Sequence, residues 1–60
     1  MTARALNDVL ASLGWTGAEL SRRLGKGKQA VSAWRTGRTE VPRYVEEYLR
    51  VMVLAKEMLG

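Results

Sequence analysis

The sequence predicts a single all-α domain of four helices, and three observations carry this prediction. The chain has only 60 residues, which is enough for one small domain. Glycines and a single proline divide it into short segments. Within those segments apolar residues recur at helical spacing. The expected helices cover about residues 3–13, 17–24, 28–36 and 42–59.

The first helix is predicted over residues 3–13, with Thr2 capping its start. Gly14 follows the last apolar residue and can supply the left-handed conformation that often ends a helix. The apolar residues that recur on one face are Leu6, Val9, Leu10 and Leu13.

The second helix, residues 17–24, has the clearest local start signal in the chain. Thr16 and Glu19 have the spacing of a capping box, in which each side chain accepts from the other residue's backbone amide. Trp15 and Leu20 occupy the two positions of a hydrophobic staple. Gly25 is expected to end the helix.

The third helix, residues 28–36, lies between Gly27 and Gly37 and buries little. Val31 and Trp34 are three residues apart and therefore share a face. The remaining surface is polar and rich in hydrogen-bonding groups. It carries Lys28, Gln29, Ser32 and Arg35.

The fourth helix, residues 42–59, begins with Pro42, a residue suited to a first helical turn. Its apolar residues cover more than half of the circumference, which is wider than the stripe of an ordinary surface helix. A domain of this size cannot cover all of that surface, so we expect a homodimer. The alternative is that one flank simply lies under the first helix. The predicted interface residues are Tyr44, Tyr48, Val51, Met52, Ala55, Met58 and Leu59.

Charge is unevenly distributed along the chain, which carries a net charge of +4. Residues 20–38 contain six basic residues and no acidic one. Such a basic segment attracts polyanions, chiefly nucleic acid. The alternative is a solvated surface that keeps the protein in solution.

The second and third predicted helices, joined by a glycine-bearing turn, form a helix-turn-helix pattern. Four apolar residues are placed to lock the two helices together, and the small Ser21 allows close approach. These four residues are Leu20, Leu24, Val31 and Trp34.

The stretch WTGAELSRRLG at 15–25, followed by QAVSAWRTGR at 29–38, resembles the Cro/C1-type (XRE-like) helix-turn-helix regulators of phages and bacteria. The small regulators associated with anti-CRISPR operons offer a looser likeness. Three features depart from the family pattern. Lys26 replaces a small apolar turn residue, Arg35 stands where many members carry glutamate, and one long helix replaces the usual last two.

The chemistry of the DNA grooves assigns roles to the exposed residues. Lysine can donate to guanine, glutamine can pair with adenine, and a methyl group can touch thymine. The expected base contacts are Lys28, Gln29, Ser32, Ala33 and Arg35, and Arg35 can reach either a base or a phosphate. Basic side chains and the amides at a helix start can bind phosphates. The expected phosphate contacts are Thr16, Gly17, Arg22, Lys26, Arg38 and Arg43.

We therefore expect a homodimeric, sequence-specific double-stranded DNA-binding repressor acting on an inverted repeat in the cytoplasm. The alternative is an antitoxin or adaptor that docks its apolar last helix on another protein. An enzyme is not expected, because the chain lacks histidine and cysteine and has one aspartate. We also expect no metal, cofactor, small-molecule ligand or membrane partner.

Overall fold

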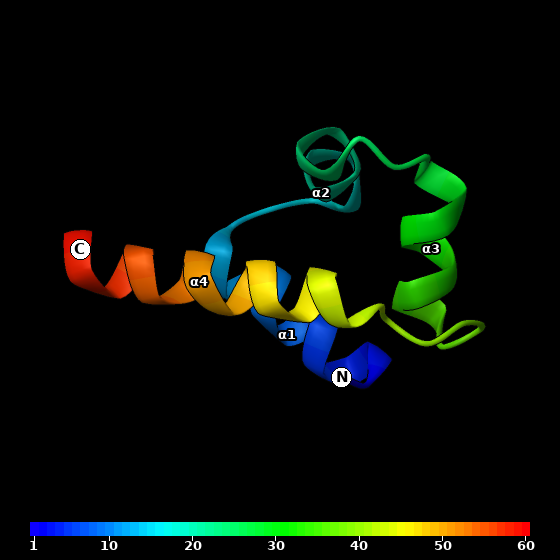
Figure 1. The fold of residues 1–60 in the computed structure, drawn as a ribbon, viewed down its shortest axis with the longest axis horizontal. Coiled ribbons are helices and arrows are strands. Elements are labelled where there is room, and N and C mark those ends of the chain that lie inside the picture. Colours follow the sequence, from blue (N-terminus) through cyan, green and yellow to red (C-terminus); the bar gives the residue numbers. More distant parts are fainter.

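The computed structural model describes all 60 residues and contains four helices and no strand (Figure 1). The helices are α1 (Ala3–Leu13), α2 (Gly17–Leu24), α3 (Lys28–Thr36) and α4 (Arg43–Leu59). The predicted all-α, four-helix class is confirmed. The one difference in bounds is that Pro42 precedes α4 as its cap. None of the helices combines the length and the apolar character needed to cross a membrane.

The helix ends follow from the local sequence. The Thr2 hydroxyl accepts from the Ala5 amide at 3.0 Å, and the Thr16 hydroxyl accepts from the Glu19 amide at 3.1 Å. Each bond satisfies an amide that the first turn of a helix leaves without a partner. Gly14 ends α1 with φ 74°, a left-handed conformation that costs glycine no Cβ clash.

The predicted capping box at the start of α2 is wrong in one half. The Thr16 hydroxyl caps the helix, but the Glu19 carboxylate does not reach back to the Thr16 amide. It accepts instead from Arg22 and, at 2.8 Å, from Arg23. Two cations one turn further along the same helix outcompete a single neutral amide, because hydrogen bonds between charged groups are stronger.

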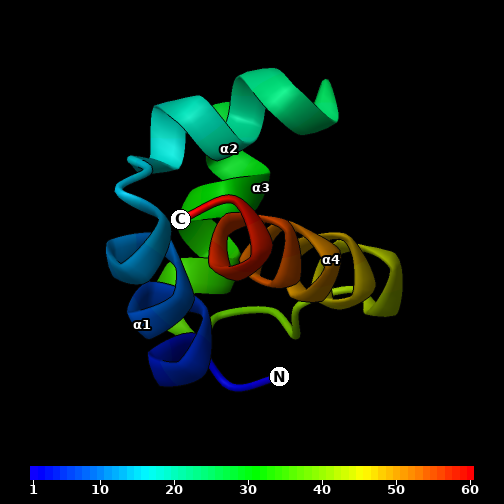
Figure 2. The same ribbon diagram turned by 90° about the vertical axis from the view of Figure 1, so that its left-hand side faces the viewer.

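Helix α1 lies at the centre of the packing, against both α3 and α4, and α2 packs on α3. Figure 2 looks nearly along α4 and shows α1 beside it, with α2 above them and α3 behind. All four helices, together with the residue before Pro42, contribute to one core. The buried apolar residues are Leu6, Leu10, Leu20, Val31, Trp34, Val41, Val45 and Leu49.

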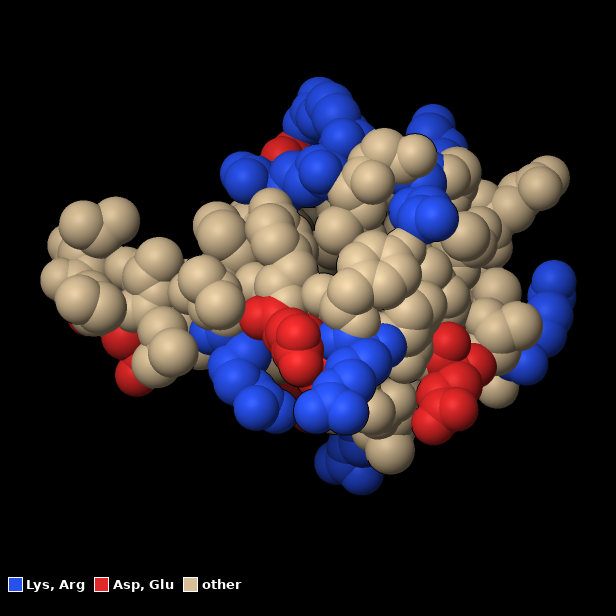
Figure 3. Space-filling model, in the orientation of Figure 1, with Lys and Arg blue, Asp and Glu red and all other residues tan.

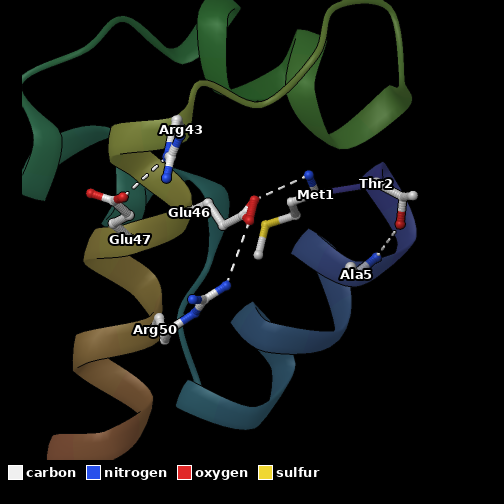
Figure 4. A network of polar contacts seen from close by, with 7 residues as sticks. All are labelled: Met1, Thr2, Ala5, Arg43, Glu46, Glu47 and Arg50. Atoms are coloured by element: carbon white, nitrogen blue, oxygen red, sulfur yellow. Dashed lines mark hydrogen bonds and ion pairs between the residues drawn. The ribbon is translucent and has the colours of Figure 1, made fainter.

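Helices α1 and α4 run in the same direction, and polar contacts tie them together at both ends. The amino group of Met1 donates to Glu46 at 3.2 Å, and Glu46 also pairs with Arg50 at 3.7 Å (Figure 4). Near the other end the Lys56 ammonium donates to the Ser12 carbonyl. Beyond this point the last turn of α4 extends past the rest of the molecule (Figure 1).

Candidate nucleic-acid interface

Helices α2 and α3 meet through a small apolar joint. Leu20 is fully buried, and Val31 and Trp34 are no more than 5% exposed. Leu24, expected to be a full member of this joint, is only half-buried and packs against its edge. The joint fixes the angle between the two helices, so the outer face of α3 is presented by a rigid support.

The turn between α2 and α3 is fastened by Ser21. Its hydroxyl is buried and donates to the Lys26 carbonyl, while the Lys26 amide donates to the Ser21 carbonyl at 3.1 Å. Gly25 lies between them with φ 69°. The sequence interpretation treated Ser21 only as a small spacer. The structure adds that its hydroxyl closes the turn.

The outer face of α3 is polar and open. Lys28, Gln29 and Ser32 are exposed as expected, whereas Ala33 is half-buried. At about 100° per residue, Gln29 and Thr36 point most directly away from the buried Val31 and Trp34. Thr36 was not among the predicted contacts, although its spacing of seven from Gln29 could have revealed it. Its hydroxyl donates to the Ser32 carbonyl at 3.0 Å.

Arg35 lies on the flank of α3 that borders α1, rather than on its outermost line. Its Nε donates to Oδ1 of Asn7 at 2.8 Å, and Nδ2 of Asn7 donates to the Arg35 carbonyl at 3.1 Å. Asn7 was missed in the sequence. Nothing in its local pattern signals a role, because its partner is 28 residues away.

A polar cleft of about 410 Å³ separates α3 from the start of α2. Arg35 reaches across it, so that a Cβ placed on Gly17 would meet Nη1 of Arg35 at 2.8 Å. The absence of a side chain at Gly17 is therefore what allows this approach. The cleft is lined by Asn7, Gly17, Ala18, Lys28, Val31, Ser32, Arg35 and Thr36.

Of the predicted phosphate contacts only Gly17 lines this cleft, and the others differ in exposure and in whether an acidic residue pairs with them. Thr16 and the cations are exposed, and Gly17 is half-buried. Arg22 pairs with Glu19 and Arg43 pairs with Glu47 at 3.2 Å, whereas Arg38 has no ion pair. Lys26 lies 5.8 Å from the ring centre of Tyr44. In Figure 3, Lys and Arg atoms gather at the top of the view, over α2 and near α3, and a second group lies along the lower edge beside acidic atoms.

Arg23 is basic, but its side chain packs within the protein, at the place where α2 and Trp15 face α4, which we call the α2–α4 seam. Its guanidinium lies 4.1 Å from the Trp15 ring centre, and the Trp15 and Tyr48 rings are 6.2 Å apart. The neighbouring Tyr48 side chain and, after it, the hydrogen bond to Glu19 raise the pKa of Arg23 above its usual value. The hydrogen bond from Arg22, assisted by Arg23, lowers the pKa of Glu19.

Helix α4 leaves a broad apolar surface uncovered. Helix α1 covers the side of α4 that carries Val45 and Leu49. On this side the structure agrees with the alternative that one flank of the last helix lies under the first. The opposite side stays open, and Val51 and Met58 on it are 61% and 85% exposed. Leu59, in the projecting last turn, is 89% exposed. Leu54, which was not among the predicted interface residues, is also exposed. Of the predicted set, Tyr44, Val51, Met58 and Leu59 are exposed, while Tyr48, Met52 and Ala55 are half-buried.

Comparison of the chain with protein-family models, curated proteins and solved structures finds no match. The features that bear on function are therefore the shape and charge of the α2–α3 unit and the uncovered side of α4.

Proposed function

We propose that this protein binds double-stranded DNA in a sequence-specific manner and acts as a homodimeric repressor. The observation that supports this proposal best is the outer face of α3. It is a short, polar, exposed helix face held on a buried apolar joint and a fastened turn. A helix of this kind fits the major groove of B-DNA, which admits one α-helix.

The residues on that face have the chemistry to read base edges. Gln29 can pair bidentately with adenine, and Lys28 can donate to guanine. Ser32 can donate or accept, and the half-buried Ala33 offers a methyl group to a thymine methyl.

Basic residues around the face supply affinity that does not depend on sequence. Arg38 is the strongest candidate, because it is exposed and has no acidic partner. Lys26 is likewise without an acidic partner, while Arg22 and Arg43 would exchange a carboxylate on the same helix for a phosphate. Exposed pairs of this kind contribute little to stability, so the exchange costs little.

A homodimer would pair through the uncovered side of α4. Twofold symmetry would set two α3 helices against successive major grooves, about 34 Å apart, on an inverted repeat. An assembly of this kind on a promoter blocks transcription by occupying the DNA. A protein with this role acts in the cytoplasm.

The test is selection of bound duplexes from a random library, followed by binding measurements on the selected site and on a scrambled one. We expect an inverted repeat. Gln29→Ala should cost about 1–3 kcal/mol on the selected site and relax one base position. Arg38→Ala should weaken both duplexes alike and lower the salt slope by about one. Failure of the wild type to enrich any duplex would refute the proposal.

The uncovered side of α4 also favours a second candidate, an adaptor or antitoxin that docks this helix on a different protein. A stoichiometric partner that co-purifies, and that Met58→Glu releases, would support it. A stable homodimer with a buried α4 would argue against it.

A further inference from the structure

Asn7 makes two hydrogen bonds to the same residue on another helix. Its Oδ1 accepts from the Nε of Arg35 at 2.8 Å, and its Nδ2 donates to the Arg35 carbonyl at 3.1 Å. One bond therefore orients the side chain of Arg35 and the other holds its backbone. An arginine side chain otherwise samples many rotamers, and a bond that holds Nε removes part of that freedom before any ligand arrives.

The fixed guanidinium faces the polar cleft beside α2. A guanidinium has five N–H donors, and Asn7 uses only the one on Nε. Nη1 lies where the side chain of residue 17 would be, above the start of α2. Lys28 lines the same cleft, and no carboxylate does. The site therefore offers free donors and two cations with no competing anion.

We propose that Asn7 is a positioning residue that aims Arg35 at a phosphate of the DNA backbone, so that Arg35 supplies affinity and orientation and does not read bases. This inference rests on the proposed DNA-binding function and chooses between the two contacts, a base or a phosphate, that the sequence allows for Arg35. Asn7 provides an acceptor for Nε and leaves both Nη groups free.

The position of Arg35 on α3 supports a phosphate over a base. Arg35 lies about 70° around the helix from the direction of Val31 and Trp34, whereas Gln29 lies about 170° away. Lys28 shares the flank of Arg35, but it stands in the first turn of α3, the part of a recognition helix that contacts base edges, whereas Arg35 stands in the last turn. A base edge at the bottom of the groove meets the outermost line of a recognition helix. A side chain on the flank, beside a neighbouring helix, meets the groove wall, where the phosphates are. Arginine binds phosphate bidentately through such paired donors.

The first test compares variants on two duplexes, one of random sequence and one selected for binding. Arg35→Ala should lose about tenfold in affinity on both duplexes and lower the salt slope by about one. Asn7→Ala should lose less than Arg35→Ala, equally on both duplexes. Arg50→Ala removes a similar charge from α4, away from the cleft, and serves as the matched control that should bind as wild type.

Gly17→Ala separates positioning from folding. Its Cβ would lie 2.8 Å from Nη1 of Arg35, so the far end of the guanidinium must shift aside. Alanine is also the better helix former, so the melting temperature should not fall. We expect weaker DNA binding from a protein at least as stable as the wild type. The expected phosphate contact of Gly17 is made by its backbone amide, which alanine keeps, so a loss of binding is assigned to the displaced guanidinium. A purely structural role for the Asn7–Arg35 contact predicts no loss of binding.

Two further variants complete the test. In the double variant Asn7→Ala, Arg35→Ala, the asparagine change should add no further loss, because it acts only through Arg35. Asn7→Asp keeps an acceptor for Nε but places a carboxylate in the cleft. It should bind DNA more weakly than Asn7→Ala. Circular dichroism at the assay temperature should show that each variant is folded.

The outcomes separate this inference from the function on which it rests. If the wild type binds neither duplex, the proposed function fails. If the wild type binds, the inference is overturned by any of three results: Gly17→Ala binding as wild type, additive losses in the double variant, or an Arg35→Ala loss confined to the selected duplex.

Discussion

Replacing Val51 with glutamate is the sharpest test of the proposed α4 interface. Val51 is 61% exposed in a single chain, so the change removes little from the monomer. Glutamate is a better helix former than valine, and an exposed substitution of this kind changes stability by about 0.5 kcal/mol or less. The variant should therefore fold normally, and any effect on association can be assigned to the interface.

The expected effect on a dimer is large because symmetry counts each change twice. Full burial of a valine side chain contributes about 1.5 kcal/mol or more, and the exposed part of Val51 represents about 1 kcal/mol of that per copy. An unpaired carboxylate left in the interface costs at least about 1–3 kcal/mol more. Two copies together give about 4 kcal/mol or more, which is about a thousandfold in the dissociation constant.

Sedimentation equilibrium over a range of concentrations measures this directly. The wild type should be dimeric at micromolar concentration and Val51→Glu monomeric. Val51→Thr keeps the side-chain volume without adding charge, and it should weaken the dimer by a smaller factor. A wild type that stays monomeric, or a Val51→Glu variant that dimerises as well as the wild type, would refute the assignment of this face.

Three further predictions concern stability and are checked by urea unfolding. Leu20→Ala should lower the free energy of unfolding by about 3–5 kcal/mol, because the side chain is fully buried. This is a large part of the total free energy of unfolding expected for so small a domain. Ser21→Ala should cost about 1 kcal/mol by opening the bond to the Lys26 carbonyl, and it should weaken DNA binding through the displaced turn. The pKa of Glu19 is lowered from 4.5, so its contribution is present at neutral pH and is lost as the pH falls through the lowered value. Glu19→Gln should therefore be less stable than the wild type at neutral pH, and the difference should shrink in acid.

The helices and most of their ends could be predicted because the signals are local. Thr2 and Thr16 cap helices through amides three residues away, and Gly14 ends a helix by its own backbone conformation. Each of these features needs only the neighbouring residues, so the sequence pattern contains all the required information.

The details of the candidate site depend on how the helices are rotated against one another, which no local pattern contains. Asn7 and Arg35 meet because α1 and α3 pack with those two faces together. The Glu19 carboxylate had several local partners available, and the spacing alone could not rank them. Tyr48 was expected in an interface between two copies, but Trp15, which lies between α1 and α2, covers part of the Tyr48 side chain.

The two tryptophans occupy sites that differ in kind, which gives the protein two built-in fluorescent probes. Trp34 lies in the dry joint behind α3, while Trp15 lies at the α2–α4 seam under a guanidinium. A variant that keeps only Trp34 would report loosening of the α2–α3 unit. One that keeps only Trp15 would report detachment of α4, so the order in which these two parts open could be followed without attaching a dye.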